Sequence, residues 1–330
     1  HVRRNESTSA ARFSIEVHDA VDHQTWHVEA DALVNATGVW VDELRNMLNP
    51  DQPSHLVAPS QGVHIVVGQE FLPTRHALLV PKTSDGRVLF AVPWLGSLVI
   101  GTTDTPRQDL PLHPKPFEDE LTFLLTEASQ VLARPIRRSD VKSVWVGLRP
   151  LVALQDSQDT QTLSREHTIV KDSSAMVSVT GGKWTTFRVM AEDTLKACFE
   201  AGVLPDRPVP GRAASQNPST AAISLTQPPG LHLYGQEQTS IGAFPGADTV
   251  LFPGFTEAMV RYAAHREWAT CVEDVLARRS RLLFLDAALA QAVAPKVAEI
   301  LFQETGIDPK LDDFMALTEQ YRIPLAVNSS

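Results

Sequence analysis

The chain has 330 residues and a formal net charge of −10, and 43% of its residues are hydrophobic and 21% charged. These values are typical of a soluble globular protein with enough residues for two domains. They argue against a nucleic-acid partner, because surfaces that bind nucleic acids neutralise phosphates with clustered lysine and arginine, and the sequence has no basic run of five residues.

The two cysteines, Cys198 and Cys271, form no CxxC pair. This pattern suits a reducing compartment such as the cytoplasm and excludes a disulfide framework or a cysteine-based zinc site. The first residues, HVRRNESTSA, lack both a methionine and a signal-peptide pattern, which favours a fragment of a longer protein.

The first 200 residues alternate between β-type and helical patterns. Residues 11–36 predict a hairpin whose second arm runs into a buried strand that ends at Gly38. The apolar run 88–103 contains Pro93 and Gly96, so it predicts another hairpin rather than a membrane span. A helix is expected within 116–132, and further strands are expected at the following segments: 62–68, 76–82, 141–153 and 176–182.

The composition changes after residue 203. Residues 204–253 are rich in proline, glycine and serine and predict a linker with extended loops, whereas 254–330 are helical nearly throughout, with Thr256 as a candidate N-cap. We therefore expect a mixed α/β (α+β) domain over 1–203, the linker, and a C-terminal all-α domain over 254–330.

The segment TGGKWTTFR, residues 180–188, resembles a phosphate-binding loop at first sight. A Walker A motif would require glycine at Val177 and serine or threonine at Trp184, so a nucleoside-triphosphate site is excluded. Gly181 and Gly182 allow a sharp turn between a buried strand and a helix whose free N–H groups, with Lys183, suit an anion or a polarised carbonyl. A plain strand–turn–helix capped by Thr185 is the alternative.

Other candidate residues lie near strand ends. Arg149, in the apolar strand VWVGLRPLV, suits a substrate carboxylate or phosphate, with an internal ion pair as the alternative. His64 follows Gly62 and is either a site residue or a structural histidine, and GTTDT (101–105) reads as a turn. The sequence contains no H-E-x-x-H, G-x-S-x-G or G-x-G-x-x-G motif, and we expect no metal site.

Several motifs in this order resemble the FAD-dependent glycerol-3-phosphate dehydrogenases, and the likeness spans nearly all of residues 11–320. They are VNATGVW, PSQGVHIVV, VPKTSDGRVLFAVPW, VIGTTDTP, VWVGLRPLV, LSREHTIV, SVTGGKWTTFRVMAEDTL and the C-terminal YAAHREWATCVEDVLARRSRLLFLD. Each motif alone is weakly specific, and their number and order carry the resemblance.

The resemblance implies a D-amino-acid-oxidase type of fold, in which an FAD-binding part is interleaved with an antiparallel substrate-binding sheet. It implies oxidation of glycerol 3-phosphate to dihydroxyacetone phosphate, a quinone acceptor, peripheral contact with the inner face of the cytoplasmic membrane, and a homodimer. His64, Arg149 and Lys183 would face the substrate, with His64 in proton transfer and Arg149 binding the phosphate or polarising the carbinol oxygen. The residues implied along the flavin are Ala36, Thr37, Gly38, Trp40, Gly62, Gly181, Gly182, Lys183, Thr185 and Thr186.

The sequence departs from the family pattern in two places. Gln61 and Val63 stand where the family carries other residues beside the histidine, and the glycine-rich loop that holds the ADP pyrophosphate is absent. We therefore expect an incomplete FAD-binding domain that alone binds FAD poorly. An amino-acid or amine oxidase of the same fold and a non-catalytic structural remnant stay open as alternatives.

Overall fold

The computed structural model describes residues 1–5, 12–153, 166–172, 175–205 and 224–323. It contains two compact units whose segments alternate along the chain. Unit 1 comprises 1–61, 104–112 and 147–216, and unit 2 comprises 62–103, 113–146 and 217–330. Both a mixed α/β part and a C-terminal helical part are present, which confirms the expected fold class. The units nevertheless interleave in the chain, unlike the linear division predicted from composition.

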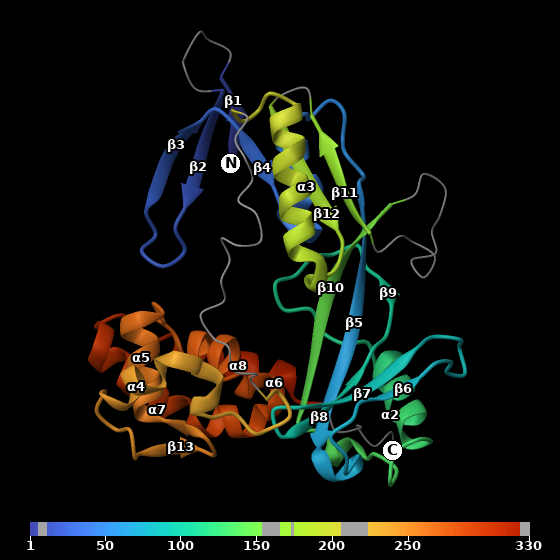
Figure 1. The fold of residues 1–330 in the computed structure, drawn as a ribbon, viewed down its shortest axis with the longest axis vertical. Helices are drawn as coiled ribbons and strands as arrows, with labels where there is room; N and C mark the ends of the chain where they lie inside the picture. Colours follow the sequence, from blue (N-terminus) through green and yellow to red (C-terminus); the bar gives the residue numbers. More distant parts are fainter. Residues whose placement is uncertain (6–11, 154–165, 173–174, 206–223, 324–330) are drawn as a thin grey trace. The chain divides into compact units, whose positions relative to one another are not determined.

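Unit 1 has two small sheets in the described part of the chain (Figure 1). The first is antiparallel, with the order β1 (Val2–Arg4), β2 (Phe13–His18), β3 (Thr25–Ala30). The second has the order β11 (His167–Lys171), β12 (Met176–Gly181), β4 (Leu33–Asn35), in which β12 pairs antiparallel with β11 and parallel with β4. The predicted hairpin is thereby confirmed, whereas the strand after it is partly exposed and ends at Asn35 instead of Gly38.

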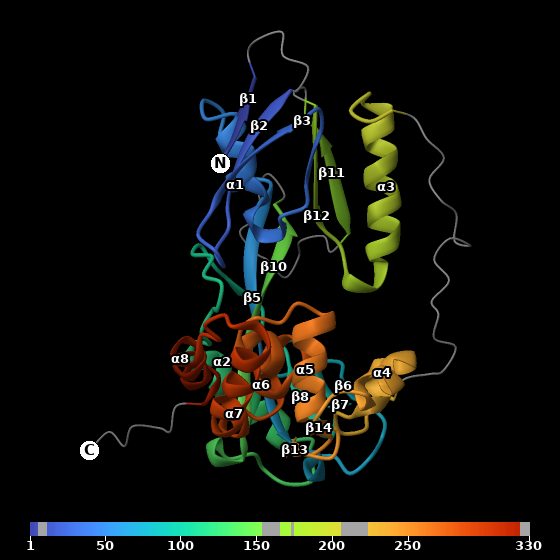
Figure 2. The same ribbon diagram turned by 90° about the vertical axis from the view of Figure 1, so that its left-hand side faces the viewer.

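Two helices complete unit 1, α1 (Val41–Leu48) and α3 (Phe187–Glu200). Helix α3 packs along β11 and β12, as Figure 2 shows. The side chains buried between these elements form one apolar cluster: Val2, Phe13, Leu48, Ala175, Met176, Val177, Ala197, Cys198 and Val203. Burial of Cys198 raises the pKa of its thiol, so this cysteine is a packing residue and not a reactive one.

Unit 2 contains the larger antiparallel sheet. Its strands are β5 (Val57–Gly68), of which residues 62–68 belong to this unit, β8 (Ser97–Gly101), β7 (Leu89–Trp94) and β6 (Leu78–Val80). Strand β10 (Ser143–Val152) enters the unit with residues 143–146, and the two-residue β9 (Thr105–Pro106) pairs with β5 inside unit 1. Helix α2 (Glu118–Ser129) buries Leu121, Leu124 and Ala128 against the sheet. The predicted hairpin at 88–103 is confirmed as β7 and β8.

The C-terminal part of unit 2 is helical. Its elements are α4 (Gln238–Gly242), β13 (Val250–Phe252), β14 (Phe255–Thr256), α5 (Glu257–Arg266), a π-helix (Asp274–Arg279), α6 (Leu282–Leu285), α7 (Ala287–Thr305) and α8 (Leu311–Tyr321). Thr256 is the N-cap residue of α5, as predicted. None of the helices in the described ranges is long and apolar enough to cross a membrane.

The segment predicted as a linker, 204–253, is partly folded. Residues 206–223 lie outside the described residues, but Ile241 and Phe252 are buried in the same cluster as Met259 of α5. The prediction differs from the structure because it is based on the content of proline and glycine, which indicates turns. That content gives no information on the few apolar side chains between the turns, which are buried and anchor the segment.

An ion-pair network joins α5 to α7. Glu304 accepts hydrogen bonds from His265, at 2.6 Å between Nε2 and Oε2, and from Arg261. The hydrogen bond from His265, together with Arg261 and against the opposing effect of burial, lowers the pKa of the Glu304 carboxyl. A carboxyl group that is more acidic in the folded chain stabilises the fold above its unfolded pKa, and this contribution is lost as the pH falls through the folded pKa.

We therefore expect E304Q to have a lower free energy of unfolding than the parent protein at pH 7, and the difference to shrink as the pH falls below the ordinary pKa of a glutamate, about 4.3. Urea titrations between pH 3 and pH 7 measure the difference, with E299Q as the control because Glu299 is exposed on the same helix. A difference that is constant over this pH range would contradict the account.

The turn after β12 requires glycine for two separate reasons. Gly181 and Gly182 have φ angles of +74° and +76°, in the left-handed region that L-residues with a Cβ avoid. A Cβ on Gly181 would also lie 2.6 Å from the carbonyl oxygen of Glu166, and one on Gly182 would lie 2.5 Å from Sδ of Met190. The first contact is with backbone, so it cannot be relieved by a side-chain rotation.

Replacing Gly181 by Ala should therefore destabilise the protein by more than the roughly 1–2 kcal/mol expected for a left-handed residue alone. G86A is the matched control, since Gly86 has φ +87° and open space where its Cβ would stand. Thermal or urea unfolding of both variants measures the excess. Equal losses would show that the contact with Glu166 has no energetic cost.

Candidate functional site

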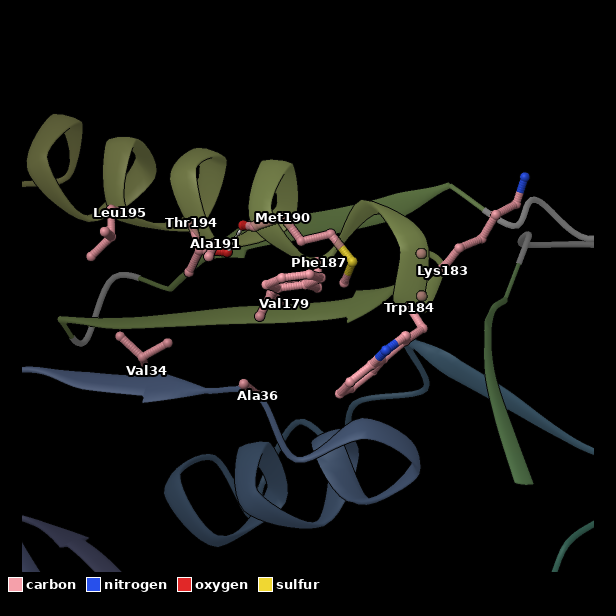
Figure 3. Close-up of a pocket in the computed structure, with 12 residues that line it drawn as sticks. Val34, Ala36, Val179, Lys183, Trp184, Phe187, Met190, Ala191, Thr194 and Leu195 are labelled. Atoms are coloured by element: carbon pink, nitrogen blue, oxygen red, sulfur yellow. Dashed lines mark hydrogen bonds between the residues drawn. The ribbon is translucent and has the colours of Figure 1, made fainter. Parts of the chain in front are cut away.

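An apolar cavity of about 580 Å³ opens between α3 and the strands β12 and β4 of unit 1 (Figure 3). The side chains and glycines that line it are Val34, Ala36, Val179, Gly181, Gly182, Lys183, Trp184, Phe187, Met190, Ala191, Thr194 and Leu195. Four residues predicted along the flavin, Ala36, Gly181, Gly182 and Lys183, are therefore brought together in one cavity.

The helical wall of this cavity follows from the spacing of apolar residues in α3. Phe187, Met190, Ala191 and Leu195 are spaced so that they share one helix face. Trp184 is 88% exposed and Phe187 55% exposed, and their rings are 6.0 Å apart. Two large exposed aromatic rings at a cavity suit a flat aromatic ligand.

A second cavity of about 370 Å³ shares the glycine turn with the first. It is lined by Leu148, Arg149, Pro150, Leu151, Gly181, Gly182 and Lys183. Figure 3 shows the amino group of Lys183 pointing away from the apolar side chains of the first cavity. The turn thus stands between an apolar cavity and one that carries two cationic side chains.

Arg149 takes part in an ion pair and also lines the second cavity. Its Nη1 lies 3.7 Å from Oδ1 of Asp104, whose side chain is only 8% exposed and accepts a hydrogen bond from Ser60. The Arg149 side chain is 26% exposed. The guanidinium therefore brings positive charge both beside Asp104 and to the wall of the second cavity, where it would attract an anion. The two interpretations of Arg149 are therefore compatible.

The residues that follow β4 hold a tight turn. Asn35 is buried, donates from Nδ2 to the carbonyl oxygen of Val41 at 2.9 Å, and accepts a 2.7 Å hydrogen bond from the hydroxyl of Thr37. Gly38 has φ +63°, which accounts for glycine there. Of the predicted residues in this segment, Ala36 lines the apolar cavity, whereas Thr37, Gly38 and Trp40 do not.

The alternative for this segment, a helix capped by Thr185, differs from the structure. A 3₁₀ turn, Trp184–Thr186, precedes α3, and the N-cap residue of α3 is Thr186. The hydroxyl of Thr186 donates to the carbonyl oxygen of Lys183 at 3.0 Å. Short 3₁₀ turns of this kind are frequent at the N-termini of α-helices. Neither threonine lines the two cavities.

His64 and Gly62 lie on β5 in unit 2. The imidazole of His64 stacks on the indole of Trp145, with ring centroids 4.1 Å apart and 15° between the planes. Gly101 of β8 is the cross-strand partner of His64 on the other side. The contacts of these residues are made within unit 2, whereas Arg149 and Lys183 belong to unit 1.

Sequence reasoning missed three residues of these sites. Asp104 was interpreted only as part of a turn. An arginine in an apolar strand, such as Arg149, needs an acidic partner, and that need was the available signal for a carboxylate like Asp104. Trp145 is four residues before Arg149 on the same strand, where alternation places both on one face. Trp184 was used only to exclude a Walker motif.

The residues present fit a flavin better than a metal ion. The apolar cavity offers aromatic and aliphatic walls for a ring system, and the adjacent cavity offers two cations for an anionic group. Among the residues that the structure describes, no group of three or more His, Cys, Asp or Glu side chains could hold a metal ion.

Comparison with known proteins connects this geometry to a family. Residues 6–194 match the family described as FAD dependent oxidoreductase, and residues 234–311 match the C-terminal domain of alpha-glycerophosphate oxidase. The second match begins within the segment predicted as a linker, in agreement with its folded structure.

Two relatives and one solved structure illustrate what the chain is similar to. "Probable glycerol-3-phosphate dehydrogenase, mitochondrial" of Caenorhabditis elegans is 37% identical over 93% of this chain and 46% of that protein, and the human mitochondrial glycerol-3-phosphate dehydrogenase is 35% identical over 88% and 43%. The chain thus spans about half the length of these relatives. The fold matches that of a Bacillus halodurans glycerol-3-phosphate dehydrogenase complexed with FAD, with TM-score 0.75, 23% identity, and coverage of 98% of this chain and 69% of that one. The chain belongs to the FAD-dependent oxidoreductase family, with a C-terminal domain of the alpha-glycerophosphate oxidase type.

Proposed function

We propose that this chain is part of an enzyme that oxidises sn-glycerol 3-phosphate to dihydroxyacetone phosphate with FAD. The observation that carries the proposal is the pair of cavities that share Gly181 and Gly182, one apolar and one with Arg149 and Lys183. The names of the relatives support the choice of substrate.

In this proposal the cationic cavity binds the phosphate of the substrate. A phosphate dianion accepts charge-assisted hydrogen bonds from the guanidinium of Arg149, and the ammonium of Lys183 adds a second positive charge. The carboxylate of Asp104, 3.7 Å from Nη1, partly balances the positive charge of Arg149 and helps to keep its side chain in place. Arg149 then fixes the end of the substrate remote from the carbon that reacts.

The apolar cavity holds the flavin ring system, and FAD when bound accepts the hydride from C2 of glycerol 3-phosphate. The glycine turn lets the ring approach the backbone, because Gly181 and Gly182 present no side chain toward it. His64 accepts the hydroxyl proton as the carbinol becomes a carbonyl. Thr37, Gly38, Trp40, Gly62, Thr185 and Thr186 stay in the proposal as residues near the flavin.

The acceptor and the location also belong to the proposal. Quinone takes the electrons, and the enzyme is a homodimer in peripheral contact with the inner face of the cytoplasmic membrane. What supports this part is the resemblance to FAD-dependent glycerol-3-phosphate dehydrogenases. Two assays test the acceptor: reduction of a short-chain ubiquinone under anaerobic conditions, and oxygen consumption in a separate aerobic assay.

An oxidase of amino acids or amines is the second candidate. A guanidinium binds a carboxylate as readily as a phosphate, so Arg149 alone does not distinguish the two substrates. The second cation, Lys183, favours the dianionic phosphate over a monoanionic carboxylate.

Substrate choice can be read from the flavin itself. We expect the full-length natural protein, loaded with FAD and mixed anaerobically with glycerol 3-phosphate, to lose its absorption near 450 nm, and to keep it with D-alanine or glycine. Bleaching by the amino acids and not by glycerol 3-phosphate would favour the second candidate. A folded protein that retains no flavin would favour a non-catalytic remnant.

Replacing Arg149 by Ala should raise KM for glycerol 3-phosphate by roughly 10- to 100-fold, because a charge-assisted hydrogen bond to phosphate is lost. Steady-state dye reduction measures KM, and R149K should recover only part of the loss because lysine cannot make a bidentate contact. R3A is the control, since Arg3 is an exposed arginine of the same unit. If R149A has an unchanged KM and a lowered melting temperature, Arg149 does not bind the substrate, and its role is the structural ion pair with Asp104.

A further inference from the structure

His64 lies in a narrow slot on the large sheet of unit 2. Three neighbouring strands form it: β8 supplies Gly101, β5 supplies His64 and β10 supplies Trp145. A Cβ on Gly101 would stand 2.3 Å from Cδ2 of the imidazole, so the ring lies directly against the glycine backbone. The indole of Trp145 covers the opposite face at 4.1 Å between centroids. The imidazole is thus held between two walls.

The backbone beside the slot is fixed by a buried hydrogen-bond chain. The N–H of Val63 donates to the hydroxyl of Thr103 at 3.0 Å, and that hydroxyl donates to Oε1 of Glu120 at 2.9 Å. Glu120 is 6% exposed and also accepts from the N–H of Phe117 at the start of α2. The segment GTTDT, read from the sequence as a turn, thereby provides one wall of the slot and the anchor for the residue before His64.

The Trp145 wall is supported in turn by the C-terminal helices. Phe284 of α6 meets Trp145 edge to face, with centroids 5.8 Å apart and 80° between the planes, and Tyr321 of α8 meets Phe284 at 5.6 Å and 72°. Such edge-to-face pairs are favourable and define the orientation of both rings. Burial, with the nearby charge of Glu273, raises the pKa of the Tyr321 phenol to about 12, so this ring stays neutral.

Two hydrogen bonds attach α6 and the first residue of α7 to the start of β10 and the residue before it. The hydroxyl of Ser143 donates to the carbonyl oxygen of Leu283 at 2.8 Å in a buried position, and the N–H of Ala287 donates to the carbonyl oxygen of Lys142 at 3.0 Å. Phe284 therefore cannot shift away from Trp145 without breaking this attachment. A continuous row of four aromatic rings extends from α8 to His64.

We propose that Phe284 and Trp145 are positioning residues, and that the C-terminal helical domain uses them to set the orientation of the His64 imidazole. The catalytic part of this inference rests on the function proposed above, in which His64 accepts the substrate proton. The domain matched to alpha-glycerophosphate oxidase then contributes to the reaction through ring packing and needs no contact with substrate.

The orientation of His64 can be measured without activity. In protein labelled with [¹³Cε1]-histidine, the His64 signal, assigned by its loss in H64Q, should be displaced upfield by the ring current of the stacked indole. W145A should remove the displacement, and F284A should reduce it. F284L, which keeps the volume and removes the aromatic ring, should act like F284A if the larger truncation unfolds the protein. F302A is the control, because Phe302 is 57% exposed on α7.

Flavin reduction by glycerol 3-phosphate in the full-length holoenzyme supplies the second readout. We expect F284A and F284L to slow the reduction about tenfold with little change in the substrate concentration for half-saturation, and F284Y to restore it. A His64 signal unmoved in both Phe284 variants would overturn the inference. If the His64 signal changes in the Phe284 variants but their rate of flavin reduction does not, Phe284 positions His64 as inferred. In that case His64 has no part in the proposed reaction.

Discussion

The left-handed conformation of Gly181 and Gly182 is the constraint on which the candidate site depends. Both residues have φ near +75°, and Cβ atoms there would meet the carbonyl oxygen of Glu166 and the side chain of Met190. The turn can therefore bring β12 and α3 close together, and it can do so only with glycine. Because no side chain fills the turn, one apolar cavity and one cationic cavity can share it.

The two cavities divide the chemistry that a flavin-dependent oxidation of a phosphorylated alcohol requires. A ring system needs an apolar wall, which the face of α3 and the end of β4 supply. A phosphate needs positive charge outside that wall, where Arg149 and Lys183 are found. Asp104, largely buried beside Arg149, keeps the guanidinium from being an isolated charge in an apolar strand.

The proton-accepting part of the proposal depends on a different kind of interaction. His64 is held by shape, between the backbone of Gly101 and the face of Trp145, and the row of rings continues to Phe284 and Tyr321. This arrangement connects the C-terminal helices to His64 within unit 2. It also explains why Gly101 cannot carry a side chain.

Local patterns in the sequence predicted much of the fold. The helix α3 was predicted after the glycine turn, and alternation with turn residues predicted the hairpins at 13–30 and 89–101. The partners of these elements were not predictable in the same way. The pairs Arg149–Asp104, His64–Trp145 and Trp145–Phe284 join residues far apart in the chain, and a single sequence carries no record of such contacts.

Two local interpretations differ from the structure. A cap at Thr185 is one of the two interpretations of its segment, because threonine is a frequent N-cap residue, but a 3₁₀ turn precedes α3, which begins at Phe187. Composition predicts a linker with extended loops over 204–253, but Ile241 and Phe252 are buried in this segment. In the second case tertiary packing outweighs a local preference.

The central claim is that the glycine turn separates the ring-binding cavity from the phosphate-binding cavity. A crystal structure of the full-length protein with FAD and glycerol 3-phosphate tests it most directly. The account predicts the flavin ring against Ala36, Gly181 and α3, and the substrate phosphate within hydrogen-bond distance of Arg149. A phosphate bound away from Arg149 and Lys183, or a flavin ring outside the apolar cavity, would contradict it.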